Sequence, residues 1–473
     1  MRGSSGIRAI VAAGLVTMVS AGLAVAAPVE AQAAVTGPGL YSFGSNAYGE
    51  LGDGTTLADN SPVLLTGLPS HVIQVAAGFE TSAALLANGT VWTWGDNNYG
   101  GLGYSSPSGI VDTPHQVPGL PTITQIALGT GDSYAVAANG SVWAWGDNTY
   151  GELGNGTTTS SYSPVQVSGL TGAWQVAAGE DFALALREDG TVWAWGDNGE
   201  GNLGDGTTVS HLVPEQVPGL AGIAQVAVGT GSFAVSDGGT LYSWGQNSLG
   251  TLGTGTSAQY TVSPAPVPGL SGVTQVTSDG VHTLALADGA VWSWGNNQCG
   301  ELGDGTTTAR STPELIDRGP ITQVAAGETF LFSGFSAAIE PNGTLLTWGC
   351  NGDGQLGPVG SDITTPTPVT DLTGVTQIAF GNQLTGLEGG AYALVVASAP
   401  AVPNLVGDTP AGAHLALQAA GLVVGQISYY VDHSCNNIGR VMYQNPPAGT
   451  IVDPGSAVSI TIGERPLYPY QCP

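Results

Sequence analysis

The sequence predicts an all-β fold of seven similar units, followed by a small α/β domain. Three observations lead to this prediction: a ten-residue motif that recurs about every 50 residues, a strand-and-turn pattern around each copy, and a change of composition near residue 398. The 473 residues include 75 glycines and 29 prolines, and only 9% are charged. A typical domain has about 25% charged residues, so the composition favours a turn-rich β protein.

The recurring motif reads aromatic-Gly-x-Asn-x-x-Gly-x-Leu-Gly, and successive copies begin 49 to 54 residues apart. Seven copies at nearly constant spacing indicate a repeat architecture. The aromatic residues that open the copies are Phe43, Trp94, Trp145, Trp195, Trp244, Trp294 and Trp348.

Each repeat carries signals for about four short strands. In the first, an alternating run at 82–86 leads into Asn88-Gly89, a pair that suits the tight turn of a β-hairpin. A second alternating strand follows at 90–94. One such sheet cannot bury both of its faces, whereas sheets packed radially can. The sequence therefore predicts a seven-bladed β-propeller over residues 34–398.

The two ends of this region indicate how the ring closes. The chain enters at 39–43 with only the returning strand of a repeat. It leaves at 375–379 and 391–395 with the other half of a repeat. Half a blade from each end makes one complete blade, which fixes the number of blades at seven.

The motif and its 50-residue period resemble the regulator of chromosome condensation repeat, in its secreted bacterial type. The resemblance covers roughly residues 37–398 and implies a seven-bladed β-propeller. The sequence departs from the family in one respect. Family repeats often carry a His-Thr pair in the second strand, and here only His282-Thr283 does.

Beyond residue 398 the tryptophan motifs stop and a different pattern begins. Asp408 or Thr409 can cap a helix that has Pro410 in its first turn and Gly421 just past its end. Three strands and one apolar helix face complete the predicted α/β domain at 399–464, and residues 465–473 form a tail. The strands are expected at 422–431, 440–444 and 457–462, and the helix face at Ala411, Leu415, Ala419 and Leu422.

This region resembles a PASTA domain. The similarity rests on Val-Pro-Asn-Leu-Val-Gly at 402–407, Asn-Pro-Pro-Ala-Gly-Thr at 445–450 and Asp-Pro-Gly-Ser at 453–456. The resemblance implies binding of cell-wall peptidoglycan or muropeptides. An insert at 432–437 and the tail depart from the family pattern.

The first 33 residues have the layout of a secretory signal peptide. Arg2 and Arg8 precede an uncharged run at 10–27, and Ala31-Gln32-Ala33 follows. We expect cleavage after Ala33, with Ala26 and Ala27 as alternatives, and a protein that is secreted or associated with the cell wall. The competing interpretation is a retained membrane anchor, since 18 uncharged residues could just span a bilayer. After cleavage we expect no membrane segment.

The charge balance excludes several kinds of partner. The chain has 35 acidic residues, seven arginines and no lysine, for a net charge of −28. Nucleic acids and anionic membrane surfaces require cations, so neither is an expected partner. A lysine Schiff base and a P-loop are also excluded. We expect a monomer whose propeller binds a cationic protein.

The four cysteines are Cys299, Cys350, Cys435 and Cys472. Their spacing matches no zinc motif, and an exported protein favours disulfides. Three pairings are possible. We predict Cys299–Cys350 and Cys435–Cys472, because each pair then stays within one domain.

No catalytic motif is present, and the six histidines are expected to be ordinary surface or turn residues. The recurring acidic turns allow two interpretations. Carboxylates could bind calcium, or Asp and Asn could bond the backbone of their own turns. Asn155 and Thr254 replace aspartate in two copies, which favours the turn interpretation. The aspartates concerned are Asp53, Asp96, Asp147, Asp197, Asp205 and Asp304.

We therefore expect a non-enzymatic binding protein with no catalytic residue, cofactor or metal, and the sequence does not identify the residues that bind its ligand. Two alternatives remain open. The first is an exported inhibitor of a secreted enzyme, because secreted bacterial propellers of the resembled family include β-lactamase inhibitors. The second is guanine-nucleotide exchange, the activity of the nuclear members, which a signal peptide and the absence of a basic arm disfavour.

Overall fold

The structure, a computed structural model, describes residues 39–466 apart from short gaps. The proposed signal peptide, the cleavage site after Ala33, and Cys472 lie outside the described residues. Within the described part, no helix is both long and apolar enough to cross a bilayer. The gaps are residues 107, 318, 330–332, 353, 357–359, 371, 373, 383–390, 398–401, 420–421 and 451–456.

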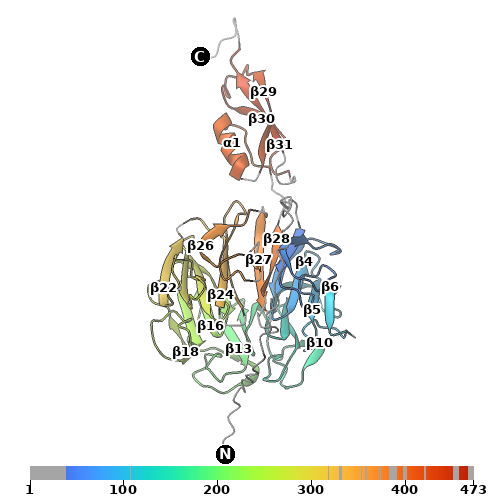
Figure 1. Cartoon of the computed structure of the whole chain (residues 1–473), viewed down its shortest axis with the longest axis vertical. Coiled ribbons are helices and arrows are strands. Elements are labelled where there is room, and N and C mark those ends of the chain that lie inside the picture. Colours follow the sequence, from blue (N-terminus) through green and yellow to red (C-terminus); the bar gives the residue numbers. More distant parts are fainter. Residues whose placement is uncertain are drawn as a thin grey trace, which may run out of the picture. The chain divides into compact units, whose positions relative to one another are not determined.

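Seven four-stranded antiparallel sheets form the blades of a propeller (Figure 1). In blades 1 to 6 the strands follow chain order across the sheet. The first strands of neighbouring blades contact one another around the ring, and β27 (Val375–Asn382) of blade 7 contacts β3 (Val72–Ala77) of blade 1. These strands are therefore the innermost ones.

The bounds of the strands follow the repeat closely. Blade 1 contains β3 (Val72–Ala77), β4 (Thr81–Leu86), β5 (Val91–Asp96) and β6 (Ile110–Gln116); blade 2 contains β7 (Ile123–Leu128), β8 (Asp132–Ala137), β9 (Val142–Gly146) and β10 (Ser161–Gln166). Blade 3 contains β11 (Ala173–Ala178), β12 (Phe182–Arg187), β13 (Val192–Gly196) and β14 (His211–Gln216); blade 4 contains β15 (Ile223–Val228), β16 (Gly231–Ser236), β17 (Leu241–Gln246) and β18 (Tyr260–Pro266). Blade 5 contains β19 (Val273–Ser278), β20 (His282–Ala287), β21 (Ala290–Gly295) and β22 (Arg310–Asp317); blade 6 contains β23 (Gln323–Thr329), β24 (Ser333–Ile339), β25 (Leu345–Gly349) and β26 (Ile363–Pro368).

Blade 7 joins the two ends of the propeller chain, as the sequence predicts. It contains β27 (Val375–Asn382) and β28 (Ala391–Ala397) from the C-terminal side, and β1 (Gly39–Gly44) and β2 (Asp59–Leu64) from the N-terminal side. β1 pairs antiparallel with β28 over its whole length, from Gly39 opposite Ala397 to Gly44 opposite Tyr392. The prediction of a shared closing blade is confirmed.

A glutamine in the inner strand joins one blade to the next at six junctions of the ring. The side chain of Gln74 donates to the carbonyl oxygen of Ile126 and accepts from its N–H, both at 2.9 Å. At the closure of the ring, the side chain of Gln377 accepts from the N–H of Val75 and donates to the carbonyl oxygen of Ile73, both at 3.1 Å. The intervening pairs are Gln125 with Val176, Gln175 with Val226, Gln225 with Val276, and Gln275 with Val324.

The motif tryptophans form a second connection between blades. Trp94 is fully buried, and its Nε1 donates to the carbonyl oxygen of Glu50 in the preceding blade at 2.7 Å. The hydroxyl of Ser82 donates to the same oxygen at 2.8 Å. Phe43 stands in the tryptophan position of blade 7 and has no N–H to donate, so the closing blade lacks this bond. The equivalent bonds run from Trp145, Trp195, Trp244, Trp294 and Trp348.

The glycine and asparagine of the motif have distinct roles. Gly95 follows the tryptophan with a φ of +108°, and a Cβ there would lie 2.3 Å from the carbonyl oxygen of Glu80, so only glycine fits. The asparagine holds the following loop. Asn148 Oδ1 accepts from Leu153 N at 2.9 Å, while its Nδ2 donates to the carbonyl oxygen of Thr157 at 3.0 Å.

The C-terminal α/β domain, which we call the tail domain, is a three-stranded sheet with one helix packed on one face (Figure 1). Its strands are β29 (Val423–Val431), β31 (Ala457–Glu464) and β30 (Val441–Asn445), in that order across the sheet, with β29 and β31 parallel. Helix α1 (Pro410–Ala419) begins where Thr409 Oγ1 accepts from Gly412 N at 3.1 Å. These elements match the predicted α/β domain.

The buried face of α1 is carried by Ala413 and Leu417, which pack against Val458 and Ile460 of β31. The sequence predicts a face of Ala411, Leu415, Ala419 and Leu422 instead. Of these, Leu422 is buried in the same core, and the side chains of the other three lie outside the described residues.

Candidate binding surfaces

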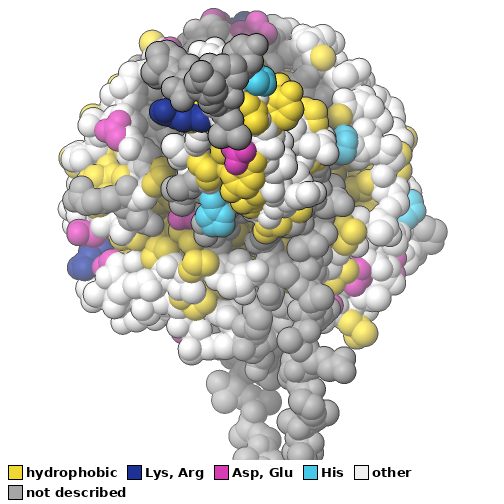
Figure 2. All heavy atoms as spheres, turned by 90° about the horizontal axis from the view of Figure 1, so that it is seen from above, with side chains coloured by type: hydrophobic (Ala, Val, Ile, Leu, Met, Phe, Trp, Pro, Cys, Tyr) yellow, Lys and Arg dark blue, Asp and Glu magenta, His cyan; other side chains and the backbone are white. Residues whose placement is uncertain are grey.

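The loops of the propeller lie at two opposite ends of its blades. The loops that carry the motif, between the third and fourth strands of each blade, form one end, which we call the motif end. The two-residue turns between the second and third strands form the opposite end, which we call the hairpin end. Figure 2 shows basic side chains only as isolated spots on the visible face, among mostly uncharged side chains and backbone.

The acidic residues of the motif loops bond within their own turns. Asp205 Oδ1 accepts from the N–H and the hydroxyl of Thr207, at 2.8 and 2.9 Å. Asn155 makes the same two bonds with Thr157, at 2.9 and 2.7 Å. Because an uncharged amide replaces the carboxylate with unchanged bonding, the structure supports the turn interpretation over the calcium one. Asp53, Asp96, Asp147, Asp197 and Asp304 also accept from groups of their own loops.

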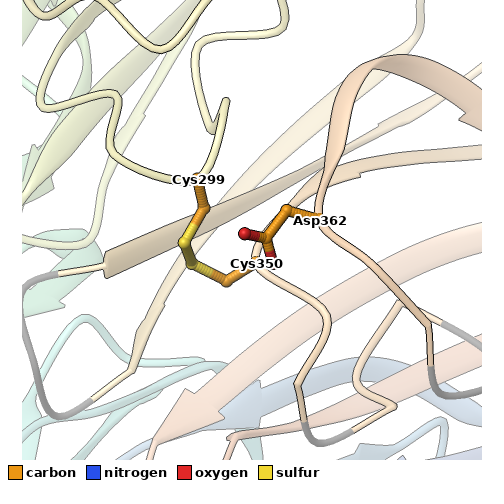
Figure 3. Close-up of side chains that lie close together, drawn as sticks. All are labelled: Cys299, Cys350 and Asp362. Atoms are coloured by element: carbon orange, nitrogen blue, oxygen red, sulfur yellow. A yellow bond between two sulfur atoms is a disulfide. The ribbon is translucent and has the colours of Figure 1, made fainter.

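A disulfide between Cys299 and Cys350 joins the motif loops of blades 5 and 6 (Figure 3). The two Cα atoms lie 5.0 Å apart. Asp362 lies beside the bridge, and its carboxylate and the two sulfur atoms fall within 4.8 Å of one another. The sulfurs are bonded to each other, so neither is a thiolate that could bind a metal. The predicted Cys435–Cys472 pair reaches outside the described residues.

His282 contradicts the expectation of ordinary surface histidines, because its side chain is fully buried. Its Nδ1 lies 2.8 Å from Asp279 Oδ2. Its Nε2 lies 2.7 Å from the hydroxyl oxygen of Ser336, in the neighbouring blade. The sequence marks His282 only as part of the single His-Thr pair in a second strand, and it does not reveal Ser336 as a partner, since that residue lies 54 positions away in another blade. His71, His115, His414 and His433 are exposed, and His211 pairs with Asp205.

Ser336, His282 and Asp279 are arranged in the order of a hydrolytic triad, but His282 is fully buried and Ser336 bonds to the backbone of the neighbouring blade. Ser336 donates its single proton to the carbonyl oxygen of Glu301 at 2.8 Å. The oxygen of Ser336 can then accept from Nε2 of His282, while Nδ1 lies within ion-pair distance of the Asp279 carboxylate. Burial lowers the pKa of His282, but the carboxylates of Asp279 and Glu301 outweigh burial and raise the pKa overall. These residues form a buried charged network without access for a substrate.

A second buried acidic cluster lies between blades 2 and 3. Asp132 is fully buried, and the hydroxyl of Tyr134 donates to its Oδ2 at 2.5 Å. Burial raises the pKa of Asp132 well above its usual value, that of Glu152 to about 7, and that of Asp181 to about 6. These carboxyl groups therefore bind protons under mildly acidic conditions.

The tail domain presents an uncharged aromatic face on the side of its sheet away from α1. Val458 and Ile460 of β31 face the helix, so the alternate residue Thr461 faces away. The register places Ser428 and Tyr443 beside Thr461, and the hydroxyls of Ser428 and Thr461 lie 2.9 Å apart. Tyr430, two residues after Ser428, shares this face, and the two tyrosines are 58% and 59% exposed. We call Ser428, Tyr430, Tyr443 and Thr461 the tyrosine face.

Two family models match the chain. The model described as "RCC1-like domain" matches residues 39–387. The model described as "PASTA domain" matches residues 400–464. The first covers most of the propeller, and the second covers the tail domain.

Curated relatives match over parts of the chain. The E3 ubiquitin-protein ligase HERC2 of Homo sapiens is 40% identical over 136 residues, which is 28% of this chain and 3% of that protein. The regulator of chromosome condensation of Xenopus laevis is 32% identical over 128 residues, 26% of this chain and 30% of that protein. The protein RCC2 homolog of Danio rerio is 39% identical over 119 residues, 24% of each. The matches thus span at most about a third of these relatives.

Solved structures match over most of the propeller. Prp20p from Saccharomyces cerevisiae, whose reported binding properties concern Gsp1p and histones, has a TM-score of 0.66 and 25% identity over 76% of this chain and 92% of its own. Human WBSCR16 has a TM-score of 0.66 and 23% identity, over 76% of this chain and 99% of its own. At such identities the second similarity concerns the fold alone.

Proposed function

Because the chain belongs to the family of RCC1-like domain proteins and carries a PASTA domain, we propose that it is a secreted, non-enzymatic binding protein with two separate binding parts. The PASTA domain docks on peptidoglycan or muropeptides. The propeller binds a protein partner. The division follows from the two family matches, because each covers one folded part with its own core.

The observation that carries the cell-wall part of this proposal is the tyrosine face on a domain matched to the PASTA family. Its described side chains are hydroxyls and aromatic rings, and none is charged. Exposed aromatic rings can pack on the apolar faces of sugar rings, and the neighbouring hydroxyls can bond to sugar hydroxyls. The face therefore suits the glycan of peptidoglycan.

The protein-binding part of the proposal rests on rigidity and charge. Loops on a rigid scaffold are the usual place of recognition, and here asparagine bonds such as those of Asn148 hold the motif loops. Prp20p, which shares this fold, is described as binding proteins. The net charge of −28 favours a cationic partner and a salt-sensitive association rate.

Purified sacculi test the wall part directly. We expect the full chain to sediment with sacculi and the variant Tyr430→Ala/Tyr443→Ala to lose at least tenfold in affinity. Tyr429→Ala is a matched control, because Tyr429 is 62% exposed in the same strand but points to the opposite face. Unchanged binding of the double variant would exclude the tyrosine face, and binding that survives deletion of 399–473 would exclude the domain.

The export part of the proposal has its own measurement. The N-terminal pattern of Arg2, Arg8 and an uncharged run supports cleavage after Ala33. N-terminal sequencing of protein recovered from the medium or the wall should then begin at Ala34. Recovery only from the cytoplasm with Met1 intact would refute export.

A further inference from the structure

The hairpin end of the propeller contains a hollow of about 410 Å³ between blades 3 and 4. It lies at the ends of strands β11, β12, β15 and β16, away from the motif loops. Five of its nine lining residues carry an aromatic ring or a charge, in a chain with only 9% charged residues. They are Trp174, Arg187, Glu188, Asp189 and Asp237.

Trp174 lies in the first strand of blade 3 and is not one of the motif tryptophans. It occupies the residue of β11 left unpaired by a β-bulge between Ala173 and Gln175, and bulges redirect side chains. Thr124 and Thr274 occupy the equivalent bulges of blades 2 and 5, and their hydroxyls bond back to a carbonyl of their own sheet. Trp174 cannot make that bond and is instead 45% exposed. The fold therefore does not explain its presence.

The positive charge in the hollow is already neutralised. Arg187 Nε donates to the carbonyl oxygen of Thr171 at 2.7 Å, and its Nη1 lies 3.2 Å from Asp189 Oδ2. Its guanidinium also lies over the ring of Trp193, 5.7 Å from the ring centre. Arg187 is thus held by the protein itself and does not favour an anionic ligand.

Two carboxylates in the hollow remain unneutralised. Among the described residues, no hydrogen bond or ion pair engages the carboxylate of Glu188 or that of Asp237, and both residues are exposed. Blades 1 and 2 carry Ala87 and Ala138 at the place of Glu188. Blade 5 carries Asp288 there, so an acidic residue at this place occurs in some blades only and is not required by the hairpin turn.

We propose that this hollow binds a lysine or arginine side chain of the propeller's protein partner. Trp174 offers its ring face to the cation and to the aliphatic part of the side chain. Glu188 and Asp237 supply the opposite charge, and the bound Arg187–Asp189 pair fixes the wall of the hollow. The inference deepens the proposed function, because it locates the protein contact on the hairpin end.

The test measures binding of acetyl-tetralysine amide to the full chain by isothermal titration calorimetry at 50 mM and 300 mM salt. We expect Trp174→Thr to weaken binding about tenfold, and Glu188→Gln/Asp237→Asn to weaken it about tenfold with a smaller salt effect. The threonine variant should fold, since other blades carry threonine there. Ile73→Thr, at the equivalent bulge of blade 1, and Glu215→Gln, an exposed acid of blade 3, should change binding less than twofold.

Each remaining outcome contradicts the proposal. Absence of tetralysine binding, or equal weakening in the pocket and control variants, would mean that only the overall negative charge attracts cations. Competition by soluble muropeptides would reassign the hollow to the cell wall. Sacculus binding by these variants should match that of the native chain, so failure of the wall function and failure of this pocket are separately visible.

Discussion

At the scale of single residues, the buried charged side chains of the propeller affect its free energy of unfolding. His282, Asp279 and Glu301 bring charge into the space between blades 5 and 6, where aromatic residues such as Phe182 occupy the position of His282 in another blade. A buried ion pair is costly to break, because the remaining partner is left charged and without solvent. The contribution of these charged residues can therefore be measured by replacing them with the uncharged residues that another blade carries at the same positions.

We predict that His282→Phe lowers the free energy of unfolding by about 3 kcal/mol, because Asp279 then remains buried without its cation. Adding Asp279→Gly, which reproduces the Gly179 and Phe182 of blade 3, should recover most of the loss. Urea denaturation of both variants measures the difference. Equal stability of the single and double variants would contradict the role of the pair.

A second residue-scale prediction concerns pH. Unfolded carboxyl groups titrate near pH 4, whereas burial raises the pKa of Glu152 to about 7 and that of Asp181 to about 6 in the folded protein. The folded state then binds more protons, so its stability is greatest at the acidic end of this window and falls as the pH rises through 6 to 7. The raised pKa of His282 acts in the same direction.

We therefore expect the melting temperature to fall between pH 5 and pH 8. Glu152→Gln should flatten this fall, and glutamine is tolerated because Gln355 occupies the same motif position in blade 6. Differential scanning calorimetry provides the measurement, with Glu215→Gln as an exposed control. A slope that Glu152→Gln leaves unchanged would contradict the assignment.

At the scale of elements, neighbouring blades are joined by three kinds of link: the glutamine bonds, the tryptophan bonds and, between blades 5 and 6, the disulfide. The first two repeat around most of the ring, and the third is local. Phe43 leaves the junction of blades 6 and 7 without the tryptophan bond. The disulfide therefore joins blades 5 and 6, at the junction next to the one that lacks a tryptophan bond.

We predict that Cys299→Ala/Cys350→Ala lowers the free energy of unfolding by about 4 kcal/mol, from the chain-entropy cost of a loop spanning 51 residues. Chemical denaturation of the variant, with the reduced native protein for comparison, gives the value. The single variant Cys299→Ala should be equally destabilised. Native-like stability in all three samples would refute the prediction.

The elements show how far sequence reasoning reaches. The seven copies of the motif and the half repeat at each end of the region are enough to predict every blade and the closure of the ring, because a hairpin is a local structure. The glutamine bonds were missed although Gln74 and Gln125 recur at one period, since an amide in a strand does not reveal its partner in another sheet. His282 was misjudged for the same reason: Ser336 reaches it from 54 residues away. The repeat pattern does not account for Trp174, because this tryptophan lies in an inner strand, outside the motif.

At the scale of the whole molecule, the ring depends on a short N-terminal segment. β1 is hydrogen-bonded to β28 on one side and β2 on the other, so it holds the outermost strand of blade 7 in place. Without β1 the sheet would expose an edge of β28 and lose the contacts of Tyr41 and Phe43 with the core.

We predict that deletion of residues 34–45 lowers the melting temperature by more than 10 °C and produces aggregates, since the strand that completes blade 7 is removed. Calorimetry and size-exclusion chromatography measure the two effects. Deletion of 399–473, which leaves all seven blades intact, serves as the control. A truncated protein that melts like the native one would contradict closure by β1.

The pairing of β1 with β28 also has a mechanical consequence. Gly39 and Ala397 lie opposite each other, so both ends of the propeller chain leave from the same end of one sheet. A force that pulled these two ends apart would unzip the ladder one hydrogen bond at a time. A force transmitted through the tail domain to a held propeller enters at Ala397 instead. There β28 is held by its ladders to β1 and to β27 on its two sides, so two sets of hydrogen bonds oppose its removal from the sheet.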